Sequence, residues 1–108
     1  MRTLSPYDKR YAGAYQGNNV QRDKAYHNGT VWTWLLGPFI TACMKVNSGQ
    51  GKDLIMHEFI GAMKEHVKEA GVGSISEIFD GEKPFHPKGC ISQAWSVAEI
   101  LRVLKEDL

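Results

Sequence analysis

Residues 31–46 read VWTWLLGPFITACMKV, and this apolar stretch decides the fold. If it forms a helix, apolar side chains occupy every side of that helix, and residues 91–104 (ISQAWSVAEILRVL) nearly repeat the pattern. A helix that is apolar all round is normally buried on all sides. Pro38 forfeits a backbone hydrogen bond inside a helix, so we expect a kink or a restart at that residue.

Residues 52–69 predict a third helix, which is amphipathic. Its apolar residues recur at four-residue spacing: Ile55, Phe59, Met63 and Val67. The charged residues face away from this stripe, and we expect His57 and His66 to be in solvent on the same polar side. Gly71 suits the left-handed residue that closes many helices.

The predicted fold class is all-α, in one domain over residues 1–108, because 108 residues support a single hydrophobic core. Residues 1–29 are polar and show no periodicity, so we expect a long irregular loop there, with the helices in residues 30–108. Three helices cannot bury two of their own number on every side. We therefore expect the chain to be completed by another polypeptide, by self-association or by further sequence.

Composition and charge exclude several classes of function. Thirteen Lys and Arg residues against twelve Asp and Glu residues argue against a nucleic-acid or anionic-membrane surface. The apolar run at residues 31–40 is too short to span a bilayer, and the N-terminus does not resemble a signal peptide, so we expect a cytoplasmic protein. Cys43 and Cys90 lie far apart and form no metal-ligand pattern, so we expect neither a metal nor a cofactor.

Two segments combine carboxylates with aromatic rings: residues 22–32 (RDKAYHNGTVW) and 73–81 (GSISEIFDG). Aromatic rings stack on the C–H faces of sugars, and carboxylates bind sugar hydroxyls or transfer protons, as in glycoside hydrolysis. These segments therefore favour carbohydrate chemistry. The alternative is that Glu77 and Asp80 are ordinary loop acids, with Asp80 and Gly81 forming a turn.

The chain resembles the C-terminal glucosidase domain of glycogen debranching enzymes. Three segments carry the resemblance in register: residues 26–39 (YHNGTVWTWLLGPF), 73–81 and 88–99 (KGCISQAWSVAE). Residues 2–5 (RTLS) are similar to a segment just upstream of the first. The resemblance implies an amylo-α-1,6-glucosidase, which removes the single glucose left at a glycogen branch point with inversion at the anomeric carbon. It also implies an (α/α)6 toroid, of which this chain would supply the last three helices.

The resemblance implies that Glu77 is the general base of this reaction. We assign α-glucan binding to five further residues: Tyr26, His27, Trp32, Phe79 and Asp80. An equally weighted alternative for His27 is that it only holds the backbone before the helix. Thr33 departs from the family, which commonly has proline at this position.

No carboxylate in the chain matches the general acid of the family, so we predict that the chain is inactive alone. Its expected partners are an α-glucan, such as glycogen or limit dextrin, and a polypeptide that supplies the rest of the toroid or a second copy of the chain. Two other hypotheses stay open. The chain can be a non-catalytic helical module that binds glucan or protein, or one subunit of a split enzyme.

Overall fold

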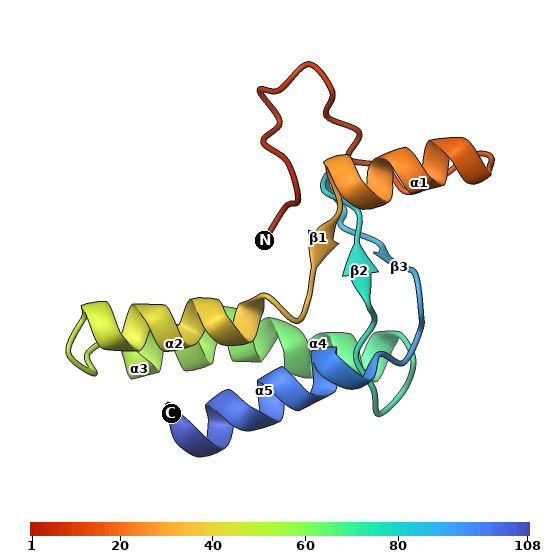
Figure 1. The fold of residues 1–108 in the computed structure, drawn as a ribbon. Helices are drawn as coiled ribbons and strands as arrows, with labels where there is room; N and C mark the ends of the chain where they lie inside the picture. The colour runs from red at the N-terminus through yellow and green to blue at the C-terminus, as the bar shows by residue number, and fades with distance from the viewer.

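The computed structural model describes residues 1–108 as a helical body joined to a small sheet and one outlying helix (Figure 1). The elements in chain order are α1 (Asn19–Asn28), β1 (Val31–Trp32), α2 (Leu36–Val46), α3 (Lys52–Ile55), the π-helical segment η1 (Met56–Ile60), α4 (Gly61–Glu69), β2 (Ile78–Phe79), β3 (Pro87–Lys88) and α5 (Ala94–Glu106). Helices α2, α5 and the run from α3 to α4 gather at one end, and the sheet leads from them to α1. No helix is long and apolar enough to cross a membrane.

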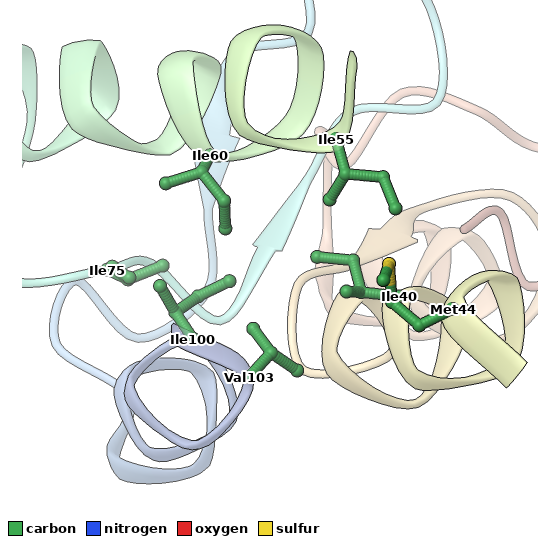
Figure 2. Close-up of a cluster of buried hydrophobic side chains, with 7 residues drawn as sticks. All are labelled: Ile40, Met44, Ile55, Ile60, Ile75, Ile100 and Val103. Atoms are coloured by element: carbon green, nitrogen blue, oxygen red, sulfur yellow. The ribbon is translucent and has the colours of Figure 1, made fainter. Parts of the chain in front are cut away.

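The core of the helical body is a cluster of apolar side chains, all of them isoleucine or valine except one methionine (Figure 2). Its members come from α2, α3, η1, the loop after α4, and α5: Ile40, Met44, Ile55, Ile60, Ile75, Ile100 and Val103. The four-residue spacing of the predicted amphipathic helix is confirmed, since Ile55 is buried and Phe59, Met63 and Val67 pack against the cluster. Ile40 and Val103 are fully buried.

The all-α prediction holds only in part: the chain is mainly helical, but three two-residue strands form an antiparallel sheet in the order β1-β2-β3. Val31 pairs with Phe79, and Ile78 pairs with Lys88. The expected helix over residues 31–46 therefore begins only at Leu36. Pro38 lies in its first turn, where a backbone N–H has no helical partner to lose.

Residues 1–29 are not wholly irregular, as α1 occupies Asn19–Asn28. The Asn18 side chain accepts a hydrogen bond from the Gln21 backbone N–H, and the Gln21 side chain accepts one from the Asn18 N–H, which is a capping box. Apart from Ala25, no residue of α1 is buried, so the helix has no apolar stripe for a periodicity search to find.

The helix expected over residues 52–69 exists as the continuous run from α3 through η1 to α4. Gly71 follows it in the left-handed region, at φ 68°, as expected from its position. The expectation that His66 is in solvent was wrong: its side chain is buried, whereas His57 is exposed. A histidine has enough apolar ring surface to pack inward when its nitrogens find a partner.

Helix α5 exposes apolar side chains beyond those that it contributes to the core. Trp95 is 46% exposed and Leu101 is 61% exposed, and Leu104 is also exposed. Ile100 and Val103 of the same helix belong to the core cluster. The helix therefore carries more apolar surface than this chain covers.

The exposed apolar residues of α5 lead to a prediction about association. We expect the chain to form dimers or larger species at tens of micromolar, because soluble monomers rarely expose contiguous apolar patches. Leu101→Glu should shift the population toward the monomer in sedimentation velocity. Val20→Glu, which adds the same charge on exposed α1, should not. A sharp monomer peak for the unaltered chain, without binding of a hydrophobic dye, would contradict the prediction.

Candidate active site

The backbone of Glu77 is held on both sides just before β2. Its N–H donates to the carbonyl of Cys90 at 2.9 Å, and its carbonyl accepts from the N–H of Thr33 at 3.2 Å. A proline at position 33 would have no N–H to donate, so this contact needs a residue other than proline there. The flanking residues Ser76 and Ile78 are buried. Glu77 therefore projects from a rigid segment.

Two donors orient the carboxylate of Glu77. The Tyr26 hydroxyl donates to Oε1 at 2.5 Å, and the backbone N–H of Cys90 donates to Oε2 at 2.9 Å. A Cβ on Gly89 would lie 2.5 Å from Oε2, so this position needs glycine for the close approach, and its φ of 69° also favours glycine. Each carboxylate oxygen keeps lone-pair capacity for one more partner, such as a water molecule.

Tyr26 is a hydrogen-bond donor at neutral pH. Burial first, and then the hydrogen bond and negative charge of Glu77, raise the pKa of Tyr26 to about 12. The Trp32 ring packs edge-on against Tyr26 with centroids 4.6 Å apart, and its Nε1 donates to the Tyr26 carbonyl at 3.2 Å. Trp32 does not line the pocket but holds the ring and the backbone of Tyr26 in place.

A pocket of about 600 Å³ opens in front of Glu77. It is lined by Tyr15, Asn19, Arg22, Asp23, Tyr26, Glu77, Gly89 and Cys90. Helix α1 and Tyr15, three residues before the N-cap Asn18, form one wall, and the segments beside β2 and β3 form the other. The wall from α1 is polar and exposed, which is typical of a surface that binds a hydroxyl-rich ligand.

Of the residues predicted to bind glucan, one lines the pocket in front of Glu77 and the others lie outside it. Tyr26 lies in the pocket with Glu77. Asp80 lies outside the lining, and its Oδ1 accepts from the backbone N–H of Tyr15 at 2.7 Å, so it holds a residue of the pocket wall. His27 is exposed beside Asp23 and outside the lining, and the Phe79 ring packs on His66 in a different pocket.

Sequence reasoning missed several lining residues. Arg22 and Asp23 lie in a segment that it singled out without assigning them a role, and the capping box at Asn18 was the signal for a helix there. Gly89 and Cys90 lie in the segment 88–99 that carries the resemblance, but nothing in the sequence placed them beside Glu77, because they reach it only through the pairing of β2 with β3. No cluster of three His, Cys, Asp or Glu side chains is placed to hold a metal ion.

The Tyr26–Glu77 hydrogen bond leads to a stability prediction. We expect Tyr26→Phe to lower the free energy of unfolding by ~1–2 kcal/mol, because it removes a half-buried hydrogen bond to a charged group. Tyr11→Phe is the matched control, since the Tyr11 hydroxyl also donates to a glutamate, the exposed Glu82, at 2.6 Å. Urea unfolding at pH 7 measures both. Equal losses in the two variants would contradict the prediction.

One comparison with known proteins gives a match over most of the chain. A family model described as Amylo-alpha-1,6-glucosidase matches residues 1–102. The match includes Glu77, both walls of the pocket and the start of α5. No solved structure matches the chain.

Proposed function

The chain belongs to the amylo-α-1,6-glucosidase family, and from this premise we propose that Glu77 is the general base of a glycogen-debranching glycoside hydrolase site. One observation carries the proposal: both oxygens of the Glu77 carboxylate are oriented by fixed donors at the wall of a polar pocket. A base needs this fixed geometry, because proton transfer requires the carboxylate within hydrogen-bond reach of the water.

The proposed reaction inverts the anomeric carbon of a terminal α-1,6-linked glucose. A water molecule bound to Glu77 attacks that carbon and gives its proton to the carboxylate, while a second carboxylic acid protonates the leaving oxygen of the glycosidic bond. The two carboxyl groups of inverting enzymes are ~6.5–9.5 Å apart, which leaves room for the water. The free lone pairs of Glu77 on the pocket side suit the first half of this step.

We propose that the polar wall from α1 binds the hydroxyls of the glucan. Asn19, Arg22 and Asp23 supply amide, guanidinium and carboxylate groups facing the pocket, and the rings of Tyr15 and Tyr26 supply apolar surface for the C–H faces of a sugar. A volume of about 600 Å³ is in the usual range for small-ligand sites.

The general acid is not assigned to any residue of this chain. Asp23 is the other carboxylate that lines the pocket, but its side chain is 78% exposed on α1 and lacks the apolar enclosure that a general acid needs. We infer that the acid comes from a segment outside these 108 residues, in the same polypeptide or in a partner.

Binding of short α-glucans tests this assignment. We expect panose, which contains an α-1,6 linkage, to shift the backbone amide resonances of Arg22 and Cys90 at millimolar concentration. Arg22→Ala should remove these shifts, whereas Lys24→Ala, on the same helix outside the lining, should retain them. Cellobiose, a β-linked glucan, is the ligand control. Shifts that map elsewhere, or equal shifts with cellobiose, would contradict the assignment.

A further inference from the structure

His66 is a buried histidine that the proposed reaction does not use. It lies on α4 and is 6% exposed. Its Nε2 is 3.1 Å from the backbone N–H of Ser76, which is 2% exposed and directly precedes Glu77 in the chain. No other hydrogen-bond acceptor pairs with that N–H, so the contact anchors the segment that carries Glu77.

His66 also touches the segment on the other side of Glu77. Its ring packs edge-on against Phe79 in β2, with ring centroids 4.8 Å apart. The histidine therefore contacts one residue before and one residue after the proposed base. Phe79 therefore forms part of the support of this segment.

The hydrogen bond fixes the protonation state of His66. Because the Ser76 N–H is a donor, Nε2 must be the unprotonated acceptor, and the neutral ring carries its proton on Nδ1. An imidazolium has N–H groups at both positions and no acceptor, so protonation would set two donors against each other in a buried site.

We propose that neutral His66 is a positioning residue for Glu77 and that protonation of His66 releases the Ser76–Glu77 segment. The inference rests on the proposed role of Glu77 as base, but the coupling between the two residues is measurable whether or not Glu77 takes part in catalysis. His66 does not line the pocket in front of Glu77. It acts on Glu77 through its hydrogen bond to the backbone of Ser76.

The surroundings of His66 determine the pH at which the Ser76–Glu77 segment is released. Burial lowers the pKa of His66, and the negative charge of Glu69 opposes this in part. Glu65 and Glu69 of α4 and His86, from the turn between β2 and β3, are the other titratable groups lining the same pocket. In the folded chain the pKa of His66 lies below the ordinary 6.5, so His66 is neutral at pH 7 and its hydrogen bond to Ser76 is intact. This hydrogen bond is lost as the pH falls through the lowered pKa of His66.

A pH titration of the full chain by NMR tests the inference. We expect the His66 ring resonance to titrate with a midpoint below 6.5. The backbone amides of Ser76 and Cys90 should follow the same midpoint as the His66 ring, although only the first contacts His66. The Cys90 N–H is the reporter because it donates to Glu77 Oε2.

Three variants separate positioning from simple stability. His66→Gln retains an acceptor and should preserve the wild-type Cys90 amide shift at pH 7 while abolishing its titration with His66. His66→Phe fills the space without an acceptor and should increase Ser76 amide exchange by ~10-fold or more. His57→Gln, at an exposed histidine, should reproduce the wild type.

The outcomes are distinct from those that test the proposed function. If the Ser76 amide follows His66 but the Cys90 amide does not, His66 is a local packing residue and the inference is overturned. If both amides titrate unchanged in His66→Gln, another group is responsible, and the inference is overturned as well. Loss of the coupling would leave the assignment of Glu77 as base unaffected.

Discussion

Replacing Glu77 by glutamine is expected to lower kcat by ~10²–10⁴-fold, with little change in KM, in a glucosidase that joins this chain to the helices that complete its site. The amide keeps the size of the side chain: its oxygen can accept from the Cys90 N–H while its NH2 group donates to the Tyr26 hydroxyl oxygen, so the binding pocket is retained. It cannot accept the proton that the attacking water must lose. Steady-state release of glucose from glycogen limit dextrin measures the effect.

Two carboxylate variants serve as controls for Glu77→Gln. Asp80→Asn should lower kcat less than Glu77→Gln does, and it should affect folding as much as kcat. The reason is that Asp80 holds the backbone of Tyr15 and does not line the pocket. Glu82→Gln changes an exposed glutamate that also accepts from a tyrosine and should leave kcat near the wild-type value. Near-full turnover in Glu77→Gln would require a new assignment of the base, with Asp80 as the next candidate.

The second large effect concerns the chain by itself. We expect the purified 108-residue chain to release no glucose from limit dextrin or isomaltose, because no residue takes the part of the general acid. Acid assistance alone is worth ~10²–10⁴-fold, and one side of the glucan site is open to solvent. The measurement is glucose release by purified chain, with a preparation of Glu77→Gln as the control for host glucosidases.

Activity of the chain alone would change the proposal in a specific way. Steady glucose release that disappears in Glu77→Gln would show that the acid lies within these residues, and Asp23 would be the residue to replace next. Release that persists in Glu77→Gln would identify a contaminant.

These two experiments also separate the competing hypotheses for the chain. A non-catalytic glucan-binding module would bind panose, yet Glu77→Gln would have no effect on any joined enzyme. One subunit of a split enzyme would become active when its partner is added in trans. We expect such a partner to pack on the exposed apolar residues of α5.

Much of the helical body followed from the sequence. The four-residue spacing from Ile55 to Val67 predicted an amphipathic helix, and the all-round apolar pattern of residues 91–104 predicted a helix with more apolar surface than this chain covers. Both patterns are local, because a helix places residues three or four apart on one face whatever else is nearby. The segment containing Glu77 was also recognisable, because its residues are consecutive.

Local patterns did not predict the sheet. Its strands are two residues long, too short for an alternating pattern to be recognised, and Val31 pairs with Phe79 far along the chain. The approach of Gly89 and Cys90 to Glu77 depends on the pairing of β2 with β3, so neither residue could be assigned to the site in advance.

The sequence by itself determined which residues form the core helices and which carboxylate stands in the motif. Only the tertiary structure decided how that carboxylate is held: Tyr26 arrives from α1, Cys90 from beyond β3, and His66 from a helix face that appeared polar. The physical reason is that a hydrogen bond depends on distance in space, and residues 26, 66, 77 and 90 share no local periodicity. Helical spacing can be read along the chain, whereas these contacts exist only once the chain has folded.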